Sequence, residues 1–347
     1  MSGSHEILRA LIGRSMKRRE LLSGAALGLC LIGAAVLALT GLTGVTYSAF
    51  TAGTDDSGNL VSAAPDFSAP LITASVIGKS SGGATGAIRP GGTYYAYANL
   101  TDAGNPSSGV AAVTSDLSTF DTGIAAAPLT AGSYTAGGVS YGYRSALLTA
   151  DTPKANGSYG YSFATLDLAA NARIQTGFSV TVDGTAPSAS AIQTTNGGAI
   201  VGRPELNDTV IYSFSETVDP ESILAGWSGA TTDVVVRIDN NAASGSNDRL
   251  TVYNSANSAL LPYSSVNLSR NNYVAANRTF GLTGTKSTMT MSGSTIAVKL
   301  GTQSGAGTTA GSGAAMIWSP AAGPTDIAGN AISLTARTET GASDIEF

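Results

Sequence analysis

Histidine and cysteine are almost absent from this chain of 347 residues, which contains one of each. His5 and Cys30 both lie before residue 49, so the remaining residues have no imidazole and no thiol group. That part of the chain therefore has no Ser-His-Asp or Cys-His catalytic centre, no zinc site of His or Cys ligands, and no disulfide bond. We expect a protein that is not an enzyme and that depends on its hydrophobic core for stability.

Charge is also scarce, since charged residues make up 12% of the chain against about 25% in a typical soluble domain. The first 48 residues contain five basic and two acidic residues, and without them the chain has 13 basic and 21 acidic residues. No basic cluster stands out among these 13. The electrostatic pattern of nucleic-acid binding is thus missing, and we expect no nucleic-acid partner.

One long hydrophobic segment, residues 21–45, follows a basic cluster at 17–19, and no charged residue occurs between Glu20 and Asp55. About 25 apolar residues in a helix are long enough to cross the hydrocarbon core of a membrane. The basic residues before the segment place residues 1–20 in the cytoplasm and the chain after it outside. We expect a signal peptide or transmembrane helix over 21–48 and a linker over 49–69.

The hydrophobic segment ends in TYSAF at residues 46–50, where small residues suit signal peptidase cleavage between Ser48 and Ala49. From Gly24 to about Ala64 the sequence resembles the SipW-type signal peptides of camelysin-like and biofilm-matrix fibre proteins. The apolar run is longer than the usual 7–15 residues of a signal peptide. Two outcomes stay open: signal peptidase releases the protein, or the segment remains as a single-pass plasma-membrane anchor.

Short apolar–polar alternations dominate the rest of the chain and predict antiparallel β-strands. Val210, Tyr212 and Phe214 alternate in this way, for example. A Gly turn at 292–294 between two alternating runs predicts a hairpin over 289–300. One helical turn is expected at 219–224, where an Asp cap precedes Pro.

Two similar corners divide this β region, DLAAN at 167–171 and DIAGN at 326–330. The first is followed by a strand and then by VDGTAPS at 182–188, whose Gly and Pro mark a linker. We therefore expect one β-domain over 70–185 and a second over 186–347.

The corner, the strand after it and the V-D-x-T-A-P run resemble the ending of bacterial Ig-like domains from surface and adhesin proteins. Residues 94–102, YYAYANLTD, are similar to the central strand of that family, and residues 207–219, NDTVIYSFSETVD, to the opening of Ig-like modules of surface-layer proteins. The resemblance implies an all-β fold of two tandem Ig-like antiparallel β-sandwiches, preceded by the N-terminal hydrophobic helix.

Four aspartates occupy turns at the expected ends of these domains: Asp102, Asp167, Asp183 and Asp326. Carboxylates and backbone carbonyls at such ends are suitable ligands for Ca²⁺, which takes 6–8 oxygens. A bound ion would stiffen a tandem array. The alternative is that these side chains cap turns by bonding to their own backbone. No catalytic residue and no cofactor other than this structural Ca²⁺ is expected.

Tyr95 and Tyr97 lie in a run of tyrosines that offers rings for stacking on a sugar, or else half-buried packing. The sequence thus favours a non-catalytic cell-surface or secreted protein that acts as a spacer, an adhesive or a matrix component. Two alternatives are a carbohydrate-binding module that docks on cell-wall glycan and a fibre-forming matrix subunit. The expected partners are the membrane, signal peptidase, and cell-wall glycan or other surface proteins.

Overall fold

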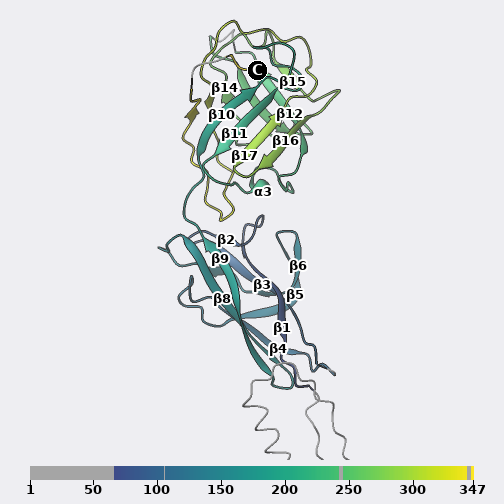
Figure 1. Ribbon diagram of the computed structural model, residues 1–347, viewed down its shortest axis with the longest axis vertical. Coiled ribbons are helices and arrows are strands. Elements are labelled where there is room, and N and C mark those ends of the chain that lie inside the picture. The colour runs from purple at the N-terminus through teal and green to yellow at the C-terminus, as the bar shows by residue number, and fades with distance from the viewer. Residues whose placement is uncertain (1–65, 105, 242–244, 342–344) are drawn as a thin grey trace, which may run out of the picture. The chain divides into compact units, whose positions relative to one another are not determined.

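The computed structural model describes residues 66–104, 106–241, 245–341 and 345–347. Their regular structure is almost entirely β, in two sheets that follow one another along the chain, with one short helix among these residues (Figure 1). The all-β class is therefore confirmed. The expected N-terminal helix, the region 1–20 and most of the linker 49–69 lie outside the described residues.

The first sheet has nine strands in the spatial order β1-β3-β6-β5-β4-β8-β9-β2, with β7 beside β3. Its strands are β1 (Leu71–Lys79), β2 (Ala87–Ile88), β3 (Thr93–Thr101), β4 (Val110–Asp116), β5 (Ala127–Ala136), β6 (Val139–Ser145), β7 (Leu148–Thr149), β8 (Gly157–Asp167) and β9 (Ala172–Val182). All pairs are antiparallel except β2 with β9.

The short segment at residues 85–88 connects the two edges of the first sheet. On one side Thr85 bridges to Gly78 of β1, and the Gly86 N–H donates to the Ile77 carbonyl at 2.8 Å. On the other side β2 pairs in parallel with Thr181 and Val182 at the end of β9. The sheet is thereby barrel-like, and not clearly the expected pair of face-to-face sheets, because one segment bonds to both of its edges.

The core of the first sheet is built from the alternating apolar residues that the sequence showed. Tyr161 and Phe163 of β8 are buried, and both pack on Phe178 of β9 with ring centroids 5.6 and 5.2 Å apart. Tyr94 of β3 is fully buried against Phe120, with ring centroids 5.5 Å apart. Strand alternation therefore places one aromatic face inside.

The second sheet has ten strands in the order β10-β11-β17-β16-β12-β13-β14-β18-β19, with β15 beside β12. Its strands are β10 (Ala189–Thr195), β11 (Thr209–Phe214), β12 (Thr232–Asp239), β13 (Arg249–Asn254), β14 (Val266–Asn267), β15 (Arg278–Phe280), β16 (Ser287–Ser292), β17 (Thr295–Lys299), β18 (Ile317–Trp318) and β19 (Arg337–Thr338). The segments that contain the end strands β10 and β19 come together, since Ser333 N donates to Pro187 O at 2.8 Å and Gln193 Nε2 of β10 to Thr340 O at 3.5 Å. This sheet is barrel-like as well.

Two predicted local structures are confirmed in this sheet. Strands β16 and β17 form the expected hairpin, and Gly293 at the turn has a φ of 57°, which favours glycine. The helix α3 (Pro220–Ile223) begins at the expected cap, where Asp219 accepts a hydrogen bond from the Glu221 N–H at 3.2 Å.

The core of the second sheet contains a cluster of fully buried aromatic side chains. Tyr212 packs edge-on against Tyr263 and Trp318, with ring centroids 4.9 and 5.3 Å apart. The Tyr263 hydroxyl donates to Met289 Sδ at 3.0 Å, so its polar group is satisfied inside the core. The two cores share no residue among those described, so each sheet buries its own apolar face.

The linker between the sheets contains residues 183–188. Gly184, Thr185 and Ala186 are exposed, whereas Pro187 is buried. Beside the linker, Lys79 at the end of β1 reaches the second sheet and donates to Asp219 Oδ2 at 2.6 Å and to Ile327 O at 2.9 Å. The junction therefore includes a buried ion pair between the two sheets.

Candidate metal centres

The first candidate centre, cluster 1, consists of Asp66, Asp102 and Asp167, with one carboxylate oxygen of each within 4.8 Å of the others. Asp66 lies just before β1, Asp102 just after β3, and Asp167 at the end of β8. Because β1 and β3 are antiparallel neighbours, the start of one and the end of the other meet at the same end of the sheet. Three segments that are distant in the sequence thus contribute acidic oxygens to one place.

The second candidate centre, cluster 2, consists of Asp183, Glu216 and Asp326, again with one oxygen of each within 4.8 Å of the others. Asp183 lies six residues before β10, and Glu216 two residues after the end of β11. Strands β10 and β11 are antiparallel neighbours, as β1 and β3 are. Cluster 2 therefore occupies the same position in the second sheet that cluster 1 occupies in the first.

The closing corners of the two clusters have matching hydrogen bonds. In the first corner the Asn171 N–H and Nδ2 each donate to the Asp167 carboxylate at 2.7 Å. In the second, the Asn330 N–H and Nδ2 each donate to Asp326, also at 2.7 Å. The predicted capping role of these two aspartates is therefore present, and it coexists with their place in a carboxylate cluster.

The aspartates that precede the first strand of each sheet also match. Asp66 Oδ1 accepts from Ser68 N at 2.9 Å, and Asp183 Oδ1 accepts from Thr185 N at 2.9 Å. The corner asparagines complete the arrangement, since Nδ2 of Asn171 donates to Asp66 O at 3.0 Å and Nδ2 of Asn330 to Asp183 O at 2.8 Å. Each corner is thus bonded to the segment through which the chain enters its sheet.

The third carboxylate of each cluster has an oxygen without a protein partner. Oδ1 of Asp102 and Oε1 of Glu216 are buried atoms that accept no hydrogen bond. Burial and then the charges of Asp183 and Asp326 raise the pKa of Glu216 to about 7. In cluster 1, backbone N–H donors from Ser68 and Ser108 instead lower the pKa of Asp66. An unpaired buried oxygen among carboxylates is costly unless a cation or a proton satisfies it.

No basic side chain neutralises either cluster within the described part of the chain. The three ion pairs found there join Lys79 to Asp219, Lys154 to Asp151, and Arg203 to Glu205. Ca²⁺ fits the donor set, because it binds six to eight oxygens from carboxylates, carbonyls and water in flexible geometry. Mg²⁺ demands a stricter octahedral arrangement. All six carboxylates would act as ligands, and the ion would supply positive charge where no ion pair among the described residues does so.

Of the six residues, the sequence had indicated Asp102, Asp167, Asp183 and Asp326, and the structure brings them together in pairs. It adds two that sequence reasoning missed, Asp66 and Glu216. A signal for Asp66 was present, because DFSAP at 66–70 repeats the DGTAP of 183–187. Glu216 stands two residues after Phe214, as Asp102 stands two after Leu100, but only the strand register makes these positions equivalent.

The two tyrosines considered for sugar stacking do not form an open platform. Tyr97 is buried and packs against Tyr141 with ring centroids 5.6 Å apart. Tyr95 is half-buried, and the Arg144 guanidinium lies 4.3 Å from the centre of its ring. A cation over the ring occupies the face that a sugar would use.

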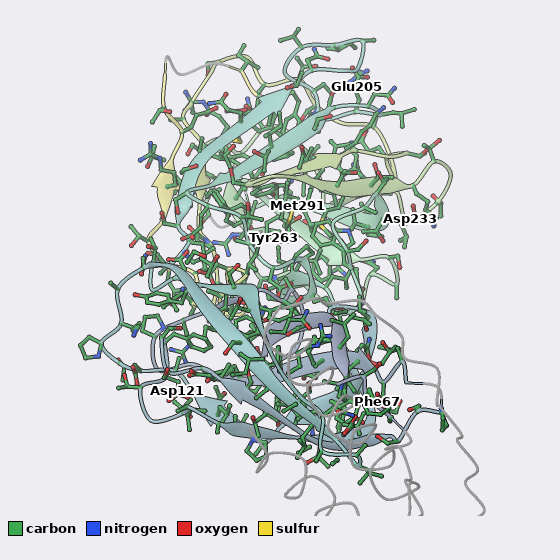
Figure 2. The ribbon with its side chains drawn as sticks, turned by 60° about the horizontal axis from the view of Figure 1, so that its bottom comes forward. Phe67, Asp121, Glu205, Asp233, Tyr263 and Met291 are labelled. Carbon is green, nitrogen blue, oxygen red and sulfur yellow. The ribbon has the colours of Figure 1, made fainter. Side chains whose placement is uncertain are left out.

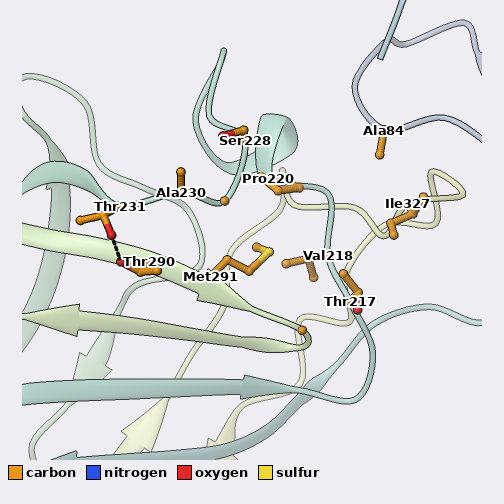
Figure 3. A pocket seen from close by; sticks show the side chains of 12 residues that line it. Ala84, Thr217, Val218, Pro220, Ser228, Ala230, Thr231, Thr290, Met291 and Ile327 are labelled. Carbon is orange, nitrogen blue, oxygen red and sulfur yellow. Dashed lines mark hydrogen bonds between the residues drawn. The ribbon is translucent and has the colours of Figure 1, made fainter. Parts of the chain in front are cut away.

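A shallow groove lies beside the junction of the sheets, near Ala84, Val218, Met291 and Ile327 (Figure 3). Its polar side chains are the hydroxyl groups of threonine and serine, and a hydrogen bond of 2.8 Å links Thr231 to Thr290. Because no ionisable side chain lines it, this groove has no acid, base or charged metal ligand of its own.

The expected cleavage site at Ser48 and Ala49 and the hydrophobic segment 21–45 lie outside the described residues. Within the residues that the structure describes, no helix has the length and apolar character needed to cross a membrane. No protein-family model matches the chain, and a comparison with curated proteins also gives no match.

Proposed function

We propose that this protein is a non-catalytic, exported structural protein of the cell surface or the surrounding matrix, with two Ig-like β-domains whose ends are stiffened by Ca²⁺. The observation that carries the proposal is the pair of equivalent three-carboxylate clusters, one at the same end of each sheet. The hydrophobic segment 21–45 and the resemblance of residues 70–347 to bacterial Ig-like surface domains support the location and the domain type.

Stiffening follows from which segments an ion would join. In cluster 2, Asp183 belongs to the linker that leaves β9, whereas Glu216 and Asp326 belong to the second sheet. An ion held by all three would fix the linker against the second sheet and reduce the freedom of the first sheet to swing. In cluster 1 the same arrangement would fix the direction in which the chain enters the first sheet. A spacer or matrix protein needs this resistance to bending.

Composition supports a non-catalytic role. The chain after Cys30 has neither His nor Cys, so a reaction centre there would have to use carboxylates, hydroxyls or lysines. Glu216, whose pKa is raised to about 7, lies within cluster 2. Its raised pKa is explained by burial and by its two acidic neighbours, without any catalytic role.

Calcium titration of the full-length chain tests the proposal. We expect two bound ions by calorimetry, one in either Asp102→Asn or Glu216→Gln, and none in the double variant. At about 100 times the dissociation constant each ion adds about 2.7 kcal/mol to the free energy of unfolding. Glu216→Gln is a mild substitution, since its Oε1 accepts no hydrogen bond.

The matched control is Asp233→Asn, an exposed aspartate of β12 outside both clusters, which should still bind two ions. With one spin label on each sheet, the distribution of label-to-label distances should become narrower when Ca²⁺ is added to the wild type. In Glu216→Gln the distribution should stay broad. Calcium that neither binds nor raises the unfolding temperature of the wild type would contradict the proposal.

A further inference from the structure

The junction inside this chain shows how one sheet docks on the next. We call the end of each sheet that carries its carboxylate cluster the cluster end, and the opposite end the loop end. In the first sheet, the loop end includes residues 80–92, between β1 and β3. This loop and Lys79 before it meet the cluster end of the second sheet, because Lys79 bonds to Ile327 O and Ala84 N donates to Asp219 Oδ2 at 3.1 Å.

The cluster end of the first sheet has the same construction but no such neighbour among the described residues. Leu168 is the equivalent of Ile327, since each directly follows its corner aspartate. Ile327 is half-buried at the junction, whereas Leu168 is 72% exposed. Phe67, which is labelled in Figure 2, is 60% exposed, and Ile174 near the start of β9 is 76% exposed. Leucine, isoleucine and phenylalanine so exposed at one end of a sheet indicate a contact surface.

The loop end of the second sheet presents a complementary surface. Residues 196–208 connect β10 to β11, as residues 80–92 lead from β1 to β3, and therefore lie opposite cluster 2. Three apolar side chains of this loop are exposed: Ile200 at 37%, Val201 at 62% and Leu206 at 39%. Neighbouring Glu205 marks the loop in Figure 2. The second sheet thus has an apolar loop in the position that the first sheet uses for docking.

We propose that the cluster end of the first sheet binds the loop end of the second sheet of another copy of this chain, through apolar side chains, so that the same two kinds of end meet between molecules as at the internal junction. The occupant is a second copy because this chain already carries both halves of the contact, the exposed cluster end and the exposed apolar loop. The two surfaces differ, so the contact is heterologous and forms an open head-to-tail chain. This inference rests on the proposed structural role and names the partner for it.

Cross-linking between introduced cysteines tests the contact in the full-length chain, kept in solution by a mild detergent. In a Cys30→Ala background, a short bifunctional maleimide is added to Leu168→Cys, to Val201→Cys, to a mixture of the two, and to a variant that carries both. We expect each single variant to remain monomeric and the mixture to stop at a dimer. The variant with both cysteines should give a ladder of dimers, trimers and larger species.

The matched control combines Leu168→Cys with Leu260→Cys in place of Val201→Cys. Leu260 is also exposed (47%) but lies outside the loop 196–208, so this control should give only the monomer. A monomer in all samples would overturn the inference, as would a Leu168→Cys dimer as abundant as that of the mixture, since that contact would be symmetric. Cross-linking of Leu168→Cys to Ser57→Cys within one chain would also overturn it, because the preceding segment would then cover the surface.

Calcium binding is measured on the same samples to separate the two proposals. Two bound ions with no ladder would mean that this inference fails while the proposed function stands. A ladder without bound Ca²⁺ would mean that the copies associate and that the calcium proposal fails.

Discussion

Lys79 Nζ lies 2.6 Å from Oδ2 of Asp219, and both side chains are almost completely buried between the two sheets. The remaining donors of Lys79 reach the carbonyls of Ala84 and Ile327, each at 2.9 Å. The same carboxylate accepts from Ala84 N and caps α3. This ion pair thus connects the first sheet, the helix and the corner next to cluster 2, and both charges are compensated inside the protein.

Removal of the lysine should strongly destabilise this junction. Lys79→Met leaves the Asp219 charge buried without its partner, and loss of one member of a buried pair costs about 3–5 kcal/mol. Lys154→Met is the control, because its pair with Asp151 is longer, at 3.8 Å, and more exposed, and should change the free energy of unfolding by less than about 1 kcal/mol. Urea unfolding measures both. Equal effects of the two substitutions would show that the junction does not depend on this pair.

The fourth residue of the corner is alanine in the first sheet and glycine in the second, and exchanging them should change stability in opposite directions. Ala170 has a φ of 67° and Gly329, its equivalent, a φ of 94°. The left-handed conformation costs a residue with a Cβ roughly 1–2 kcal/mol. We therefore expect Ala170→Gly to raise the unfolding temperature and Gly329→Ala to lower it, as calorimetry can measure. If both substitutions act in the same direction, backbone strain at the corners is not the cause.

The pKa of Glu216 predicts how stability depends on pH when Ca²⁺ is removed by a chelator. The folded pKa, about 7, lies above the ordinary value of 4.5, so between these values the folded state binds more protons than the unfolded state. The contribution of this group is therefore complete below about pH 4.5 and is lost as the pH rises through about 7. Stability without Ca²⁺ should fall between pH 5 and about pH 7.5.

Glu216→Gln should remove this part of the pH dependence, whereas Glu221→Gln, an exposed residue of α3, should leave it unchanged. Excess Ca²⁺ should also flatten the curve, because the ion holds the carboxylate in its charged form. Chemical denaturation at several pH values provides the measurement. A wild-type curve that rises toward pH 7.5 without Ca²⁺ would be inconsistent with a raised pKa of Glu216 in cluster 2.

Separate cores predict that the two halves fold independently. Fragments 66–185 and 186–347 each contain a complete sheet with its own buried cluster, so each should unfold cooperatively when expressed alone. Fragment 186–347 should be less stable than the second sheet in the whole chain, because Asp219 loses Lys79. Circular dichroism during thermal unfolding checks this. A fragment without a cooperative transition would mean that the sheets fold only together.

Sequence patterns predicted the strands best where a single strand has one buried face. The alternation of Val210, Tyr212 and Phe214 corresponds to three buried side chains of β11, and the turn at Gly293 lies where its hairpin was expected. Local chemistry sufficed there, because alternation and turn residues act over a few positions. After the second corner the chain forms only the two-residue strand β19, Arg337–Thr338, since the preceding residues make only isolated contacts such as the bridge of Thr325 with Ala331.

The carboxylate clusters could be predicted only in part, because they depend on register. Asp167 and Asp326 were visible as members of a repeated motif. Asp66 could be predicted only by comparing DFSAP at 66–70 with DGTAP at 183–187. Glu216 could not be matched to Asp102, because the residue type and the surrounding sequence both differ. Barrel-like closure of the first sheet could not be predicted either. The closing segment bridges Thr85 to Gly78 and pairs β2 with β9, but it contains only two strand residues, too few for an alternating pattern.

That small closing segment has a consequence for how such a protein behaves when crowded. A strand at the edge of an open sheet offers unpaired N–H and C=O groups to any passing chain, and this is a common route to aggregation. In the first sheet, residues 85–86 bond to residues 77–78 at the end of β1. Strand β2 covers the end of β9 in the same way. Sideways fusion of neighbouring molecules through their backbones is thereby suppressed along these stretches. Along these stretches, contact between densely packed copies is left to side chains, and their chemistry can select one partner over another.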